Sequence, residues 1–125
     1  NICVVNSDIF WQKKNKLELL NFLQDYNNVT HCKILLSNKN SFFGLKKDRG
    51  DFSIKKKNVS NWSEGKDIIF YSGFQIVSKH IFKNKPKIFP MNEVWNNLII
   101  DKNLKGTLIN SNILHVGDKS SYINL

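Results

Sequence analysis

The opening stretch of the chain is the feature that most constrains its fold. Residues Ile2–Val5 form a continuous apolar run, which ends in the polar residues Asn6, Ser7 and Asp8. Such runs are typical of strands buried in a parallel sheet, and open α/β sheets bind their ligands just beyond the carboxyl ends of the strands. The pattern therefore predicts a buried parallel strand over residues 2–7. It also predicts that Asp8 lies where a carboxylate can meet a metal ion or a phosphate.

The chain is the right size for one domain, predicted over residues 1–125. Its hydrophobic content of 41% is enough for a packed core, and no apolar stretch is long enough to span a bilayer. Cys3 and Cys32 lie in apolar runs, so we expect buried free thiols in a reducing cytoplasm and no membrane partner. A disulfide between them is the alternative.

The charge of the chain is strongly positive, with a formal net charge of +9. This excess would ordinarily favour a nucleic acid as partner. However, Arg49 is the only arginine among the 19 basic residues, and the lysines are spread along the chain. Proteins that read base sequence prefer the arginine fork. We therefore expect a solvated basic surface and no nucleic acid, although attraction of phosphorylated ligands stays open.

The remaining pattern predicts alternating helices and strands. An amphipathic helix is predicted over residues 12–26, with a buried stripe of Leu19, Phe22, Leu23 and Tyr26. The other predicted elements, in chain order, are a strand (30–37), a hairpin of two short strands (52–54 and 59–62), a long strand (67–77), a helical turn (78–82), a helix (91–101), two strands (105–111 and 112–116) and a turn into a helix (117–125). This order predicts an α/β fold with a mixed sheet flanked by helices.

Five segments along the chain carry a resemblance to a known family. They are Val4-Val5-Asn6-Ser7-Asp8, Arg49-Gly50-Asp51-Phe52, Tyr71-Ser72-Gly73-Phe74-Gln75-Ile76, Phe89-Pro90-Met91-Asn92-Glu93-Val94-Trp95 and His115-Val116-Gly117. In this order they resemble motifs of the sugar-1-phosphate nucleotidyltransferases, above all N-acetylmuramate-1-phosphate uridylyltransferases and mannose-1-phosphate guanylyltransferase-like proteins. The resemblance implies a truncated Rossmann-like nucleotidyltransferase fold.

The resemblance covers only the sugar-phosphate-binding, C-terminal half of such enzymes. In the family, a Gly-rich loop in the other half holds the nucleotide phosphates by backbone N–H groups. The 125 residues contain no G-x-G pattern. We therefore expect the N-terminal nucleotide-binding half to be absent, the chain to be inactive alone, and a nucleoside triphosphate to bind only if that half is supplied.

The resemblance also implies a set of site residues. Asp8 is the predicted catalytic residue and ligand of Mg²⁺, and His115 matches the second metal position, although histidine is a softer ligand. The predicted sugar 1-phosphate contacts are Asn6, Gly50, Asp51, Tyr71, Ser72 and Gly73. Read from the sequence alone, Asp8 and Asp51 are equally typical turn residues, His115 a packed histidine, and Gly73 the mark of a strand bulge.

Two other functions stay open at this point. In the first, the chain is one half of a split enzyme, and a partner chain or a second copy pairs with its first strand. In the second, it is a small basic module that binds nucleic acid or another polyanion.

Overall fold

The computed structural model describes residues 2–24, 31–45, 47–83 and 90–116. The α-helices are α1 (Lys16–Gln24) and α2 (Met91–Ile100). The described residues also form three short 3₁₀ helices, η1 (Lys13–Asn15), η2 (Lys39–Ser41) and η3 (Lys79–Phe82). The strands are β1 (Ile2–Val5), β2 (Ile9–Phe10), β3 (Cys32–Asn38), β4 (Phe42–Phe43), β5 (Phe52–Lys55), β6 (Asn58–Asn61), β7 (Ile69–Val77), β8 (Leu104–Leu108) and β9 (Ile113–His115).

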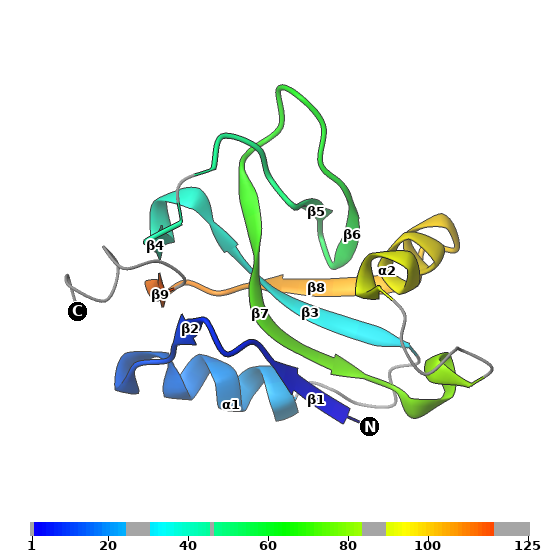
Figure 1. Ribbon diagram of the computed structural model, residues 1–125, viewed down its shortest axis with the longest axis horizontal. Helices are drawn as coiled ribbons and strands as arrows, with labels where there is room; N and C mark the ends of the chain where they lie inside the picture. The colour runs from blue at the N-terminus through cyan, green and yellow to red at the C-terminus, as the bar shows by residue number, and fades with distance from the viewer. Residues whose placement is uncertain (1, 25–30, 46, 84–89, 117–125) are drawn as a thin grey trace.

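Six of these strands form one mixed sheet with the order β1-β7-β3-β8-β6-β5 (Figure 1). Strand β3 pairs antiparallel with β7 and parallel with β8. The sheet curls at its far edge, because β5 also pairs with β7 through Phe52 and Ile69. The predicted mixed sheet is therefore confirmed. A second, three-stranded sheet has the order β2-β9-β4 and pairs an early segment of the chain, Ile9–Phe10, with the last described strand.

The two helices cover opposite faces of the large sheet. Successive side chains of a strand point to opposite faces, and in β3 Ile34 packs in one core cluster while Leu35 packs in the other. Val94 of α2 belongs to the cluster of Ile34, whereas Phe22 of α1 belongs to the cluster of Leu35. Because both of its faces are covered, β3 is buried along nearly its whole length.

The prediction for the first strand is wrong in two respects. Strand β1 pairs antiparallel with β7, and it lies at the edge of the sheet. Its side chains are largely exposed in consequence, with Ile2 at 37% and Val5 at 48% of full exposure. A run of apolar residues favours a strand but does not determine whether neighbours flank it on both sides.

The two cysteines are free thiols, as expected, but only Cys32 is buried. Cys3 is exposed because it belongs to the edge strand β1. The prediction of two buried thiols is therefore wrong for Cys3.

The predicted amphipathic helix is present in a shorter form, as η1 followed by α1. Its buried stripe is narrower than predicted. Phe22 is buried and Leu19 packs beside the same core cluster, whereas Leu23 is 41% exposed. Tyr26 lies outside the described residues.

The other predicted elements agree closely with the structure. The hairpin is formed by β5 and β6, in which Lys55 pairs with Asn58. The long strand, the helical turn and the second helix correspond to β7, η3 and α2, and the last two strands to β8 and β9. The helix predicted over residues 117–125 lies outside the described residues.

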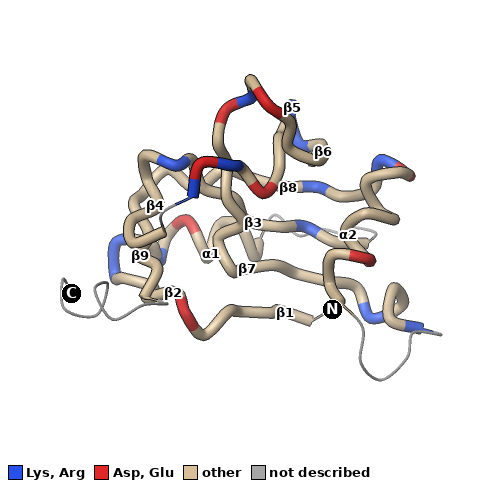
Figure 2. Tube along the Cα trace, turned by 45° about the horizontal axis from the view of Figure 1, so that its top comes forward, with Lys and Arg blue, Asp and Glu red and all other residues tan. Residues whose placement is uncertain are grey.

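Basic residues are as dispersed in space as they are in the sequence. Figure 2 shows lysine and arginine on separated segments of the surface, including η1, the turn between β5 and β6, η3 and the turn after α2. Within the described ranges, neither helix has the length and apolar character needed to cross a membrane.

Candidate functional site

A bulge in β7 organises the centre of the candidate site. Leu35 of β3 pairs with Phe74, but the next residue, Leu36, pairs with Tyr71. Ser72 and Gly73 are therefore extra residues on β7, as the sequence predicts for this glycine. Gly73 has a φ of 91°, a conformation that only glycine adopts without strain.

The bulge fixes the segment that follows β1. The backbone N–H of Asn6 donates to the carbonyl of Gly73 at 2.7 Å. A Cβ atom on Gly73 would lie only 2.8 Å from Ile9 Cγ1 and 3.0 Å from Asn6 Cβ. This close approach leaves no room for a larger residue, and it places the Asn6–Ile9 turn, which includes Asp8, directly beside the bulge.

The turn brings Asp8 to His115. Strand β2 pairs with β9 so that Ile9 lies opposite His115, and the Val116 N–H donates to the Asp8 carbonyl at 2.8 Å. His115 Nε2 lies 3.0 Å from Asp8 Oδ2. An ionised carboxylate can only accept hydrogen bonds, so the imidazole is the donor in this contact. The two residues predicted at the metal positions are therefore neighbours.

The second oxygen of this carboxylate is the candidate ligand atom for a cation. Asp8 Oδ1 is buried and has no hydrogen-bond partner within the part of the chain that the structure describes. Among those same residues, no group of three or more His, Cys, Asp or Glu side chains could hold a metal ion. Mg²⁺ is commonly bound through only one or two carboxylates together with water and substrate phosphates. Asp8 fits that coordination through Oδ1, and His115 fits it less well because its imidazole is a softer ligand.

A pocket of about 460 Å³ lies between β5, β7 and α2. This volume is within the range of roughly 300–1,000 Å³ common for small-molecule sites. It is lined by Gly50, Asp51, Phe52, Asn61, Tyr71, Asn92, Trp95 and Asn96. Three predicted sugar contacts thus share one pocket, namely Gly50, Asp51 and Tyr71.

Five lining residues were not predicted as site residues, namely Phe52, Asn61, Asn92, Trp95 and Asn96. Three of them lie in the motifs that carry the resemblance, and the sequence holds signals for Asn61 and Asn96. Asn96 lies four residues after Asn92 and therefore on the same face of α2. Asn61 is the cross-strand partner of Phe52 in the predicted hairpin.

Asp51 is held by the strand next to it. Its backbone N–H donates to the Ile69 carbonyl at 2.8 Å, and its Oδ2 accepts the Tyr71 N–H at 3.0 Å. Lys47 Nζ lies 2.7 Å from Oδ1. A carboxylate has about four lone-pair positions, so these two side-chain contacts leave capacity for ligand hydroxyl groups.

An aromatic cluster forms the other wall of the pocket. The Trp95 ring packs edge-on against Tyr71 and Phe52, with centroid distances of 5.0 Å and 5.3 Å. Its Nε1–H donates at 3.2 Å to Oε1 of Gln75, which is buried. Burial raises the pKa of Tyr71, so its hydroxyl stays neutral. The wall is therefore aromatic and uncharged.

The other three predicted sugar contacts lie apart from this lining. Asn6 and Gly73 form the junction between the β1 turn and the bulge. Ser72 is fully buried, and its Oγ accepts the Phe74 N–H at 3.3 Å. Ser72 and Gly73 form the bulge, and Asn6 connects the Asp8 turn to it. The bulge separates this turn from Tyr71.

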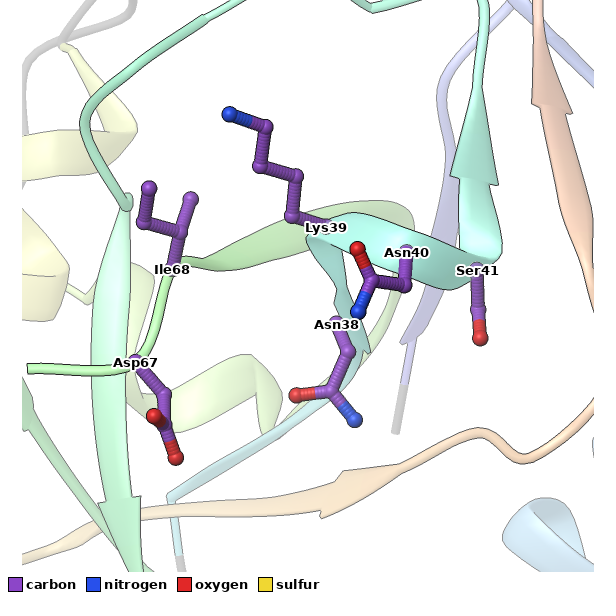
Figure 3. Close-up of a pocket in the computed structure, with 6 residues that line it drawn as sticks. All are labelled: Asn38, Lys39, Asn40, Ser41, Asp67 and Ile68. Carbon is purple, nitrogen blue, oxygen red and sulfur yellow. The ribbon is translucent and has the colours of Figure 1, made fainter.

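A second pocket, of about 440 Å³, lies at the carboxyl end of β3 (Figure 3). It is lined by Asn38, Lys39, Asn40, Ser41, Asp67 and Ile68. Its rim is closed by a hydrogen bond from the Lys39 N–H to the Ile68 carbonyl at 3.0 Å. In Figure 3 the side chains of Asn38 and Asp67 extend to one side, and those of Lys39 and Ile68 to the other. No motif in the sequence predicts this pocket, although the end of a central strand is a common ligand position.

Comparison with known proteins finds similarity among solved structures. No protein-family model matches the chain, and no curated protein matches it. Among solved structures, the fold is similar to a Bacillus anthracis protein described as a glucose-1-phosphate thymidylyltransferase, crystallised with sucrose. The TM-score is 0.60 at 13% sequence identity, over 98% of this chain and 51% of the other. The chain thus has the fold of about half of that thymidylyltransferase structure.

Proposed function

We propose that this chain is the sugar-phosphate-binding part of a nucleotidyltransferase, and that it binds a sugar 1-phosphate in the pocket between β5, β7 and α2. The observation that carries the proposal is the meeting of Asp51, Tyr71 and Trp95 in one pocket. These residues come from three separate motifs that each resemble the same enzyme family. The fold similarity, which covers 98% of the chain, supports the same assignment.

The lining has the chemistry that a sugar requires. Asp51 and the side-chain amides of Asn61, Asn92 and Asn96 offer acceptors and donors for hydroxyl groups. The half-buried Trp95 ring offers an apolar surface for the C–H face of the sugar. Lys47, which contacts Asp51, adds positive charge near a phosphorylated ligand.

We further propose that Asp8 binds Mg²⁺ through Oδ1. Bound there, Mg²⁺ would supply neutralisation of phosphate charge, the main requirement of nucleotidyl transfer. His115 holds Oδ2 and thereby orients the carboxylate. Direct ligation by His115 Nε2 would require this contact to break.

A matched pair of variants tests the Mg²⁺ proposal. Asp8→Asn removes the negative charge of the ligand, and we expect it to weaken Mg²⁺ binding at least tenfold in a calorimetric titration. Asp67→Asn is the control, since it removes an exposed carboxylate from the pocket of Figure 3. Equal Mg²⁺ affinity in both variants would contradict the role of Asp8.

The proposal concerns binding rather than turnover by these 125 residues. The sequence has no Gly-rich phosphate loop, so we propose that a nucleoside triphosphate binds only when a nucleotide-binding half is supplied. A longer chain, or a partner chain paired along β1, could supply it. The finer assignment to uridylyltransferases or guanylyltransferase-like proteins rests on the sequence motifs alone.

Calorimetric titration with glucose 1-phosphate and mannose 1-phosphate tests the proposed function. We expect saturable binding of at least one of them to the 125-residue chain. Asp51→Asn and Trp95→Leu should each weaken it at least tenfold, and Asp67→Asn should leave it unchanged. Circular dichroism of each variant establishes that the fold is intact.

A polynucleotide titrated alongside the sugar phosphates separates this proposal from the basic binding module. Binding of neither sugar phosphate, or equal binding by all variants, would contradict the proposal. Tight binding of a polynucleotide that falls steeply with salt would instead favour the basic binding module.

A further inference from the structure

Two histidines lie together at the opposite end of β7 from the β2–β9 pair. His31 directly precedes β3, and His80 lies in η3, which follows β7 (Figure 1). His31 Nδ1 is 3.1 Å from His80 Nε2, and the ring centroids are 5.1 Å apart. His31 is half-buried and His80 is exposed, so solvent and ions reach the pair.

Ser78 contacts both histidines, through its backbone and through its side chain. Its backbone N–H donates to the His31 carbonyl at 2.8 Å, which holds the chain on either side of the pair in place. Its Oγ lies 2.6 Å from His80 Nδ1. When this oxygen accepts the Nδ1 proton, the lone pair of His80 Nε2 faces His31. A hydrogen bond to the second ring nitrogen is the usual support of a metal-binding histidine.

We propose that His31 and His80 form a binding site for a divalent late transition metal, with Zn²⁺ as the probe. In the structure the two nitrogens share a hydrogen bond, and zinc would replace its proton, which would move to Nε2 of His31. Two nitrogens on a tetrahedral zinc ion lie about 3.3 Å apart, close to the separation seen here. Imidazole suits Zn²⁺, Cu²⁺ and Ni²⁺ rather than Mg²⁺, so this site differs in chemistry from Asp8.

Water completes the coordination shell in this proposal. Within the described ranges no third His, Cys, Asp or Glu joins the pair. Two protein nitrogens hold the ion, and the remaining positions face solvent. The site therefore binds and releases its ion readily, unlike the closed four-ligand sites that hold structural zinc.

The test is a zinc titration in a Cys3→Ser background, because the exposed Cys3 thiol could itself bind zinc. Cys32 does not compete, since burial raises the pKa of its thiol to about 12. We expect one Zn²⁺ per chain by calorimetry. His31→Gln and His80→Gln should each weaken binding at least tenfold while keeping a polar side chain at the position. Ser78→Ala should weaken binding about tenfold, the lower end of the effect of losing such support.

Asp67→Asn is the matched control, because it removes an exposed carboxylate that lies before β7, at the other end of this strand from the two histidines. We expect it to leave zinc affinity unchanged. In a nuclear magnetic resonance titration, zinc should shift the signals of His31 Nδ1 and His80 Nε2. The proposal is overturned by the absence of zinc binding in the Cys3→Ser protein. It is equally overturned if His31→Gln and His80→Gln, folded by circular dichroism, bind zinc as tightly as their parent.

Discussion

At the scale of single residues, two polar side chains of the first helical segment hold the loop before β9. Asn15 is fully buried, and its Nδ2 donates to Ser111 Oγ at 2.8 Å and to the Asn112 carbonyl at 2.9 Å. The Glu18 carboxylate accepts the backbone N–H groups of Asn110 and Ser111 at 2.6 Å and 2.7 Å. Buried polar groups are costly unless paired, so these contacts define the path of the loop that leads to His115.

Glu18 should make the stability of the fold depend on pH. Partial burial raises the pKa of its carboxyl, but the hydrogen bonds from Asn110 and Ser111 together lower this pKa by a larger amount. The pKa therefore lies below its ordinary value. A lowered pKa stabilises the folded state at pH values above the pKa of the unfolded chain, which is about 4.3. This contribution is lost as the pH falls through the lower pKa of the folded state. Glu18→Gln should cost at most about 1 kcal/mol at neutral pH, because the side chain is only partly buried.

Urea denaturation at pH 7 and at pH 3 measures this effect. We expect the difference in unfolding free energy between the parent and Glu18→Gln to be present at pH 7 and to be smaller at pH 3. Glu64→Gln, at the exposed ion pair with Arg49, is the control. A difference for Glu18→Gln that is the same at both pH values would contradict the assignment.

At the scale of elements, the bulge in β7 separates the two parts of the candidate site. Tyr71, before the bulge, lines the pocket, while Gly73, within it, contacts the Asn6–Ile9 turn. A regular strand would alternate its side chains without the two extra residues, and Asn6 would lose the Gly73 carbonyl as its acceptor. The bulge therefore positions both Asp8 and the pocket.

Substitution of two glycines isolates the contribution of this close packing. Gly73 and Gly65 have φ values of 91° and 87°, but a Cβ atom on Gly65 meets no atom within 4 Å. Gly65→Ala should therefore cost only the conformational strain, about 1 kcal/mol. Gly73→Ala adds the clash with Ile9 and Asn6, for a total of about 2–4 kcal/mol.

Thermal or urea denaturation of both variants provides the measurement. Equal destabilisation of Gly73→Ala and Gly65→Ala would show that the Asn6–Ile9 turn yields to the added methyl group. The bulge would then not fix the position of Asp8.

Local sequence patterns predicted the elements well, because they depend on neighbours along the chain. The spacing of Val94 and Leu98 defines the buried face of α2, and Gly73 marks the bulge. The sheet position of β1 could not be predicted in this way. An apolar strand such as Ile2–Val5 looks the same at an edge and at the centre, and its exposure follows only from the strand order.

At the scale of the whole molecule, the topology joins motifs that are distant in sequence. Asp51 and Trp95 lie 44 positions apart by their numbering, and they meet because the β5–β6 hairpin and α2 both border the same stretch of β7. The resemblance predicted one set of six sugar contacts, which includes Gly50, Asp51 and Tyr71. Only the structure separates these three from Asn6, Ser72 and Gly73, because that division depends on the bulge.

The comparison with the solved structure places this chain against part of a larger protein. The fold similarity extends over nearly the whole chain but over about half of the solved thymidylyltransferase structure. The proposed function therefore rests on the pocket between β5, β7 and α2 and on its binding of a sugar 1-phosphate.

The most direct test is to locate glucose 1-phosphate on the ¹⁵N-labelled chain by nuclear magnetic resonance, with and without Mg²⁺. The account predicts chemical-shift changes concentrated at Gly50, Asp51, Tyr71 and Asn92 and at the Trp95 indole, with an additional change at Asp8 when Mg²⁺ is present. Unchanged spectra at millimolar ligand, or changes confined to the Asn38–Ser41 and Asp67–Ile68 pocket of Figure 3, would contradict it.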